Sequence, residues 1–110
     1  MRTLQSISLD LVFKALADET RRELLQTLCK SSYSIRELAE PFDISFAAVA
    51  KHVGVLERAG LITRKKRGRE QICSINPLTL QAAHQWLGFY ESFWNQQLDH
   101  LDDYVSLLSK

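Results

Sequence analysis

The sequence predicts a mainly α fold of the α+β class, in which helices are followed by a two-stranded hairpin and a long last helix. Apolar residues recur at helical spacing through residues 8–59, and residues 61–75 hold two extended runs that can turn at Gly68. An apolar heptad stripe then begins at Leu80. Two short helices joined by a tight turn and followed by a hairpin are the elements of a winged helix-turn-helix.

Local signals mark where the first three helices begin and end. The first helix is expected over about residues 8–17. Asp18 is a good N-cap for the second helix, which a polar turn at residues 31–34 follows. The third helix starts in "SIRE", where Ser34 and Glu37 have the spacing of a capping box, and Pro41 keeps it short. The buried stripe expected on the second helix consists of Leu24, Leu25 and Leu28.

The second half of the chain has equally clear boundaries. Ser45 is placed to cap a fourth helix over about residues 46–59, and Gly60 is its natural stop. Residues 61–66 and 71–75 are expected to pair as a hairpin. Asn76 and Pro77 then form an N-cap and a first helical residue. The last helix is therefore expected over about residues 77–109, as the dimerisation element of a single domain that comprises residues 1–110.

The composition indicates an ordinary globular protein without a membrane partner. Of the 110 residues, 45% are apolar, the net charge is only +1, and no apolar run is long enough to span a bilayer. The first ten residues lack the apolar core of a signal peptide, so we expect a cytoplasmic protein. Cys29 and Cys73 cannot form a disulfide framework, and we expect both to be reduced thiols that pack as small apolar groups.

Positive charge is concentrated at the hairpin. Five of the six residues from position 64 to position 69 are cationic, which favours contact with the phosphates of DNA over a merely solvated turn. These expected DNA-contacting residues are Arg64, Lys65, Lys66, Arg67 and Arg69.

The fourth helix has one apolar and one smooth side, as a helix that enters the major groove needs. Val49, Val53 and Leu56 recur at helical spacing and should face the core. Phe46 either packs on a thymine methyl or covers the junction with the third helix, and both interpretations stay open. For His52, a place at the edge of the core is favoured over direct reading of a base. The residues expected to lie on the DNA side are Ser45, Phe46, Ala47, Ala50, Lys51 and His52.

Several stretches of the chain resemble the ArsR-type family of bacterial winged-helix repressors. They are "VFKALADETRRELLQTL", "SIRELAEPFDIS", "AVAKHVGVLERAGLI" and "RKKRGREQICSI", and the tail "WLGFYESFWNQQLDHLDDYV" resembles one subgroup of the family. The resemblance implies a homodimeric repressor that binds double-stranded DNA at a roughly palindromic operator. Where the family often has Gln, Ser and Arg, this chain has Phe46, Ala50 and Gly54, so no sequence preference can be transferred.

The family's metal-sensing positions are also changed. Where many relatives have a Cys-x-Cys pair, this chain has Ser34 and Arg36, neither of which is a soft ligand. The last helix offers His84, His100 and Asp103 without a preceding Asp-x-His. We therefore expect no metal site and no cofactor, and DNA release that does not depend on a metal ion.

The last helix has an apolar seam with the heptad spacing of a coiled coil. Residues at two heptad positions line it over about four heptads, and the stripe is wider than a small winged-helix body can cover. We expect it to form the interface of a homodimer, with the first helix contributing. The residues expected in this interface are Leu11, Leu87, Tyr90, Trp94, Leu98, Leu101, Tyr104 and Leu108.

Other functions have less support. No nucleophile motif, paired acidic site or phosphate-binding loop is present, so no catalytic residue is assigned and an enzyme is not expected. A protein-interaction module with weak or lost DNA binding, and a metal- or thiol-responsive sensor of the same family, remain as alternatives. The sequence does not specify the operator, the regulated genes, the controlling signal or the direction of regulation.

Overall fold

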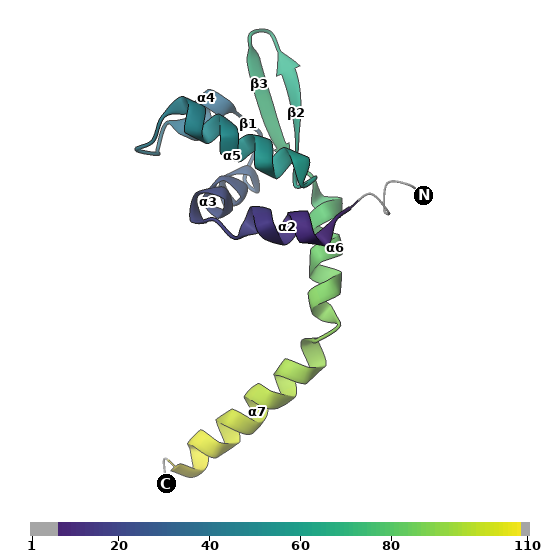
Figure 1. Cartoon of the computed structure of the whole chain (residues 1–110). Helices are drawn as coiled ribbons and strands as arrows, with labels where there is room; N and C mark the ends of the chain where they lie inside the picture. The colour runs from purple at the N-terminus through teal and green to yellow at the C-terminus, as the bar shows by residue number, and fades with distance from the viewer. Residues whose placement is uncertain (1–6, 109–110) are drawn as a thin grey trace. The chain divides into compact units, whose positions relative to one another are not determined.

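The computed structural model describes residues 7–108, and the chain divides into two compact units, Met1–Leu80 and Gln81–Lys110. Figure 1 shows the order of the elements along the chain. The first unit holds five helices or parts of helices among its described residues, together with a small sheet. Its elements are α2 (Leu9–Leu16), α3 (Glu19–Leu28), β1 (Tyr33–Ser34), α4 (Ile35–Ala39), α5 (Phe46–Arg58), β2 (Ile62–Arg67), β3 (Glu70–Ile75) and the start of α6 (Pro77–Gly88).

Side-chain caps begin the four helices α2 to α5. Ser8 and Asp18 accept hydrogen bonds from the backbone N–H groups of residues 11 and 21, and Ser45 accepts one from residue 48. Ser34 and Glu37 form the complete capping box, with Oγ of Ser34 3.1 Å from the Glu37 nitrogen. Each of these bonds satisfies a backbone donor that the helix itself leaves unpaired. The predicted caps at Asp18, Ser34 and Ser45 are therefore confirmed.

The core of the first unit comes from one apolar face of each helix. The expected stripes on α3 and α5 are buried, and Val49, Val53 and Leu56 have no exposed surface. Burial of each such side chain contributes about 1.5–3 kcal/mol. Because the apolar side of α5 is fixed in this core, its opposite side faces outward. The largest fully buried apolar side chains also include Leu24, Leu38, Leu61, Ile62 and Val12.

Gly60 ends α5 in the left-handed region that only glycine adopts without strain, with a φ of +80°. A Cβ at this position would lie 3.3 Å from Oγ1 of Thr79, which is itself buried. We expect Gly60→Ala to lower the free energy of unfolding by about 1–2 kcal/mol. Urea denaturation measures this loss. Gly68→Ala is the control, because Gly68 also has a positive φ, of +65°, but a Cβ there would have no atom within 4 Å, so only the backbone effect remains. An equal loss in both variants would show that Thr79 yields without cost.

The hairpin is confirmed, but the sheet has a third strand that the sequence analysis did not predict. β2 and β3 pair antiparallel, and β1 pairs antiparallel with the other edge of β3. Tyr33 lies opposite Cys73 and Ser34 opposite Ile72, within what was predicted as a polar turn over residues 31–34. That prediction was wrong at residues 33 and 34, because a two-residue strand shows no alternation and depends on a partner some 40 residues away.

The expected continuous last helix is also wrong, since the chain forms two helices, α6 and α7 (Glu91–Leu108). The break lies at Phe89 and Tyr90, whose N–H groups bond to the carbonyls three residues back, at Trp86 and Leu87. Gly88, a poor helix former, directly precedes it. The break interrupts the predicted seam between Leu87 and Trp94. Residue 109, the last residue of the predicted helix, lies outside the described residues.

Candidate nucleic-acid interface

Helix α5 presents a smooth outward side beside the hairpin. Phe46, its first residue, is 55% exposed, and Ala47 and Lys51 are exposed as well. Ala50 and Gly54 are partly exposed and add almost no bulk, so another molecule can approach the helix backbone closely. Lys51 has no hydrogen bond or ion pair within the described residues and is free to engage an external acceptor.

The five cations of the hairpin do not share one environment. Side chains alternate along a strand, so Arg64 and Lys66 lie on the face of the sheet that carries buried Cys73, and Lys65 and Arg67 lie on the opposite face. Arg69 follows Gly68 at the tip. All of these residues except Arg64 are exposed, so the hairpin offers positive charge on both faces and at its end.

Arg64 differs from its neighbours because it is paired. Its Nη2 and Nε lie 2.7 and 3.2 Å from Oε1 of Glu57, on the last turn of α5. The two side chains are partly exposed, so the pair contributes little to stability. It does join the base of the hairpin to the end of α5.

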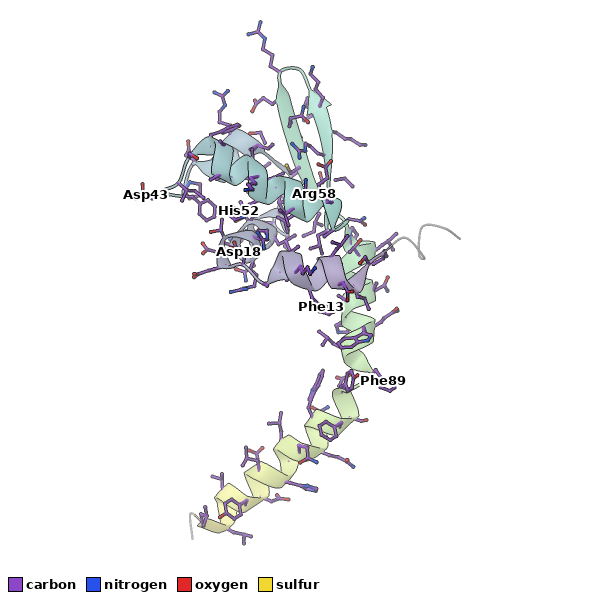
Figure 2. All side chains as sticks on the ribbon, viewed as in Figure 1. Phe13, Asp18, Asp43, His52, Arg58 and Phe89 are labelled. Carbon is purple, nitrogen blue, oxygen red and sulfur yellow. The ribbon has the colours of Figure 1, made fainter. Side chains whose placement is uncertain are left out.

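His52 lies where α5 meets the start of α3, near Asp18 and at the edge of the core (Figure 2). Its Nδ1 lies 3.2 Å from Nη1 of Arg21 and 3.8 Å from Oδ2 of Asp18. An arginine can only donate, so in the neutral ring Nδ1 accepts and the proton is on Nε2. Nε2 has no partner within the described residues, which leaves one donor of a partly exposed ring available.

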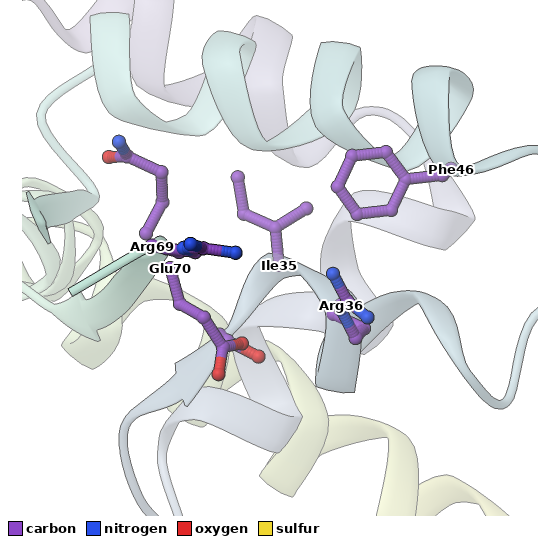
Figure 3. Close-up of a pocket in the computed structure, with 7 residues that line it drawn as sticks. Ile35, Arg36, Phe46, Arg69 and Glu70 are labelled. Atoms are coloured by element: carbon purple, nitrogen blue, oxygen red, sulfur yellow. The ribbon is translucent and has the colours of Figure 1, made fainter. Parts of the chain in front are cut away.

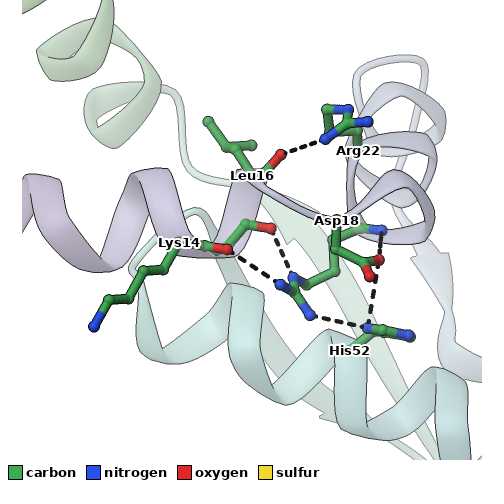
Figure 4. Close-up of polar contacts among 7 residues, drawn as sticks. Lys14, Leu16, Asp18, Arg22 and His52 are labelled. Carbon is green, nitrogen blue, oxygen red and sulfur yellow. Dashed lines mark hydrogen bonds and ion pairs between the residues drawn. The ribbon is translucent and has the colours of Figure 1, made fainter.

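Arg21 connects three helices through its hydrogen bonds. Figure 4 shows the end of α2, with Lys14 and Leu16, beside Asp18 and His52. Besides His52 on α5, the Arg21 guanidinium donates to the carbonyls of Ala15 at 2.6 Å and of Lys14 at 3.1 Å, at the end of α2. Arg22 donates to the next carbonyl, that of Leu16, at 2.7 Å. The sequence analysis missed this network. Its signal was the pair of arginines in the first turn of α3, directly after a helix end whose carbonyls need donors.

The carboxylate of Asp18 belongs to the same cluster. The backbone N–H of Arg21 lowers the pKa of Asp18 most, and the nearby His52 ring and Arg21 guanidinium lower it further, against the opposing effect of desolvation. Because the pKa of Asp18 is lower in the native protein, its ionised carboxylate stabilises the fold at pH values above the pKa of Asp18 in the unfolded chain. This contribution is lost as the pH falls through the native pKa, so Asp18 contributes to unfolding in acid.

The two cysteines have different environments. Cys73 is fully buried in β3, and burial raises the pKa of its thiol, while Cys29 is exposed at the end of α3. Within residues 7–108, no three His, Cys, Asp or Glu side chains gather as a metal-binding group. In the same part of the chain, no helix is long and apolar enough to cross a membrane.

The described residues of α7 are exposed throughout, and none is buried. The predicted interface residues on it include Trp94, which is 38% exposed, and Leu101, which is 54% exposed. Leu11 on α2 is also largely exposed. The two units differ in charge: residues 1–80 hold 13 of the 14 Lys and Arg, whereas residues 81–110 hold four acidic residues and one lysine.

Comparison with known proteins agrees with this geometry. Residues 18–64, from the cap of α3 to the base of the hairpin, match the family described as "Bacterial regulatory protein, arsR family". The transcriptional repressor SdpR of Bacillus subtilis is 33% identical over 76 residues, which cover 69% of this chain and 84% of that protein. The regulator Rv2034 of Mycobacterium tuberculosis is 32% identical over 89 residues, which cover 81% of this chain and 80% of that protein.

Solved structures show the same fold. A crystal structure of an ArsR family transcriptional regulator matches with a TM-score of 0.74 and 37% identity, over 79% of this chain and 96% of that one. An ArsR-like regulator from Rhodococcus sp. RHA1 matches with a TM-score of 0.68 and 33% identity, over 86% and 90%. These proteins are transcriptional regulators and not enzymes. The chain therefore belongs to the arsR family of bacterial regulatory proteins and has the winged helix-turn-helix fold of a DNA-binding transcriptional regulator.

Proposed function

We propose that the protein is a homodimeric, sequence-specific repressor that binds a roughly palindromic operator in the bacterial cytoplasm. The observation that carries the proposal is the outward side of α5, which has small side chains and the donors of Lys51 and His52, next to a hairpin with four exposed cations. A helix in the major groove and a hairpin along the phosphates need these two surfaces side by side. The family and the repressors among its relatives support the same reading.

In this proposal α5 is the recognition helix. Ser45, Phe46, Ala47 and Ala50 lie against the groove, where the small side chains allow close approach to the base edges. Among residues 7–108, neither Lys51 nor Nε2 of His52 has a hydrogen-bond partner, so both can donate to DNA. Because Nδ1 of His52 is held by Arg21, its contact is with a phosphate at the groove edge and not with a base.

The hairpin is the wing that neutralises phosphates. Lys65, Lys66, Arg67 and Arg69 are exposed and have no ion pair within the described residues, so no intramolecular contact has to be broken on binding. Arg64 would contribute through a second interaction of its guanidinium, because Glu57 already occupies two of its donors. Release of counterions from the phosphates would supply much of the affinity.

The second unit would be the dimerisation element of this single functional domain. An 18-residue helix that has no buried residue and has two aspartates in its C-terminal half is marginal in water, because acidic groups near a helix C-terminus oppose the helix dipole. Its seam of exposed large apolar residues provides the missing stabilisation when it pairs with a second copy. The interface proposed comprises Leu11, Leu87, Tyr90, Trp94, Leu98, Leu101, Tyr104 and Leu108.

Replacement of Arg67 and Arg69 by alanine tests the role of the wing. We expect weaker binding to all DNA sequences and a flatter plot of log affinity against log salt. Each lost phosphate contact reduces that slope by about 0.9, so the double change reduces it by roughly two for each protomer. Fluorescence anisotropy with specific and random DNA at several salt concentrations measures both effects. Lys14→Gln, on α2, is the control for loss of an exposed cation elsewhere. A slope unchanged in the double variant would show that the hairpin is not on DNA.

A further inference from the structure

A small cleft lies between the start of α5, the start of α4 and the wing (Figure 3). Its volume is about 100 Å³, enough for roughly three water molecules or one phosphate-sized group. Phe46 lines it from α5, Arg36 from α4, and Arg69 and Gln71 from the wing. The cleft therefore opens among the elements that the proposed function places on DNA.

The two arginines of the cleft are cations without a partner. Neither Arg36 nor Arg69 has a hydrogen bond or ion pair within the described residues, and both are exposed. By contrast, the side chains of Ser34 and Glu37, next to Arg36, are already engaged in the capping box, where each bonds to the backbone N–H of the other residue. Two guanidinium groups from separate elements that line one cleft form a site for an anion with oxygens on more than one side.

Phe46 gives the same cleft an apolar wall. Its ring is half-exposed at the first position of α5. In the major groove the only apolar group on a base edge is the C5-methyl of thymine. An apolar wall beside two free guanidinium groups thus matches a thymine methyl and a phosphate on the same strand.

We propose that this cleft receives one phosphate of the operator between Arg36 and Arg69, with the methyl group of a neighbouring thymine against the Phe46 ring at its wall. The inference rests on the proposed function and adds to it a contact residue on α4, Arg36, and a preferred base. Glu70 also lines the cleft, and its carboxylate extends away from the Phe46 ring in Figure 3. Its negative charge still opposes a phosphate nearby, so removal of that charge should strengthen binding.

Two charge changes with opposite expected signs test the phosphate. Arg36→Gln should weaken operator binding and reduce the salt slope by about 0.9 for each protomer, and Glu70→Gln should strengthen binding. Lys14→Gln is again the matched control, and melting temperatures establish that each variant is folded. If Arg36→Gln leaves both affinity and slope at wild-type values, or behaves like Lys14→Gln, no phosphate lies in the cleft.

Replacement of thymine by deoxyuridine tests the base. In an operator selected from random DNA, each thymine is exchanged for deoxyuridine, which removes only the methyl group. One symmetric position should weaken wild-type binding by about fourfold for each half-site, the value of one buried methyl group. Phe46→Ala should be insensitive there, while Phe46→Leu keeps most of the sensitivity. Wild-type sensitivity that persists in Phe46→Ala, or is absent everywhere, would overturn the inference. Failure of wild-type protein to select any DNA would instead overturn the proposed function.

Discussion

Simultaneous replacement of Trp94 and Leu101 by glutamate is expected to yield monomers that no longer bind the operator tightly. Both residues lie on the α7 seam, seven positions apart, and both remain exposed in the single chain. Burial of a large apolar side chain is worth about 1.5–3 kcal/mol, and a two-fold interface counts each residue twice. Four buried carboxylates in place of four apolar groups would leave no stable interface.

The loss of DNA binding follows from symmetry. A dimer binds two half-sites at once, whereas a monomer contacts DNA through only one recognition helix and one wing. Sedimentation velocity at micromolar concentration measures the state of assembly, and anisotropy measures the affinity. Ser92→Glu with Ser106→Glu adds the same charge at polar positions of α7 and should leave the dimer intact. A wild-type protein that sediments as a monomer would end the dimer proposal.

Loss of the Arg21 guanidinium is expected to be the most costly single change in the helical body. Arg21→Ala removes three hydrogen bonds that join α2, α3 and α5, and it leaves the carbonyls of Lys14 and Ala15 without this donor. Hydrogen bonds from a charged donor contribute more than neutral ones, so we expect a loss of about 2–4 kcal/mol in the free energy of unfolding. Urea denaturation followed by circular dichroism measures it.

The neighbouring arginine is a matched control. Arg22 makes one exposed hydrogen bond, to Leu16, so Arg22→Ala should cost less than about 1 kcal/mol. Arg21→Lys should recover only part of the loss, because an ammonium group cannot reproduce the planar fork that reaches three acceptors. Equal effects of Arg21→Ala and Arg22→Ala would show that the bridge between helices contributes nothing beyond a helix cap.

The elements predicted correctly from the sequence are those whose signals are local. Ser34 and Glu37 are three residues apart, and Gly60 ends a helix by its own backbone preference, so neither needed knowledge of the tertiary structure. The break in the last helix was missed because the heptad stripe continues through it, with Leu87 and Trp94 in phase. Periodicity records which side of a helix is apolar, and it does not record whether the backbone bends.

The candidate site divides in the same way. The wing cations and the small residues of α5 could be found from the local sequence alone, because each group lies within one short stretch. The Arg21–His52 contact joins residues 31 positions apart, and the cleft unites Arg36 with Arg69, so only the fold brings these residues together. The first unit thus combines a candidate recognition surface that is visible in the sequence with supporting contacts that are not.

The wing is anchored to neighbouring elements at its base but not at its tip, among the described residues. At its base β1 pairs with β3 beside Cys73 and Ile72, and Arg64 is tied to Glu57. Beyond Lys65 only two strands continue, to a glycine turn with open space around it. The end of the hairpin can therefore bend while its base keeps register with α5. In the proposed complex, this bending would let the cationic side chains follow the phosphates as the width of the groove changes with DNA sequence. Tolerance of DNA shape would then come from the tip, and base selection from the rigid helix.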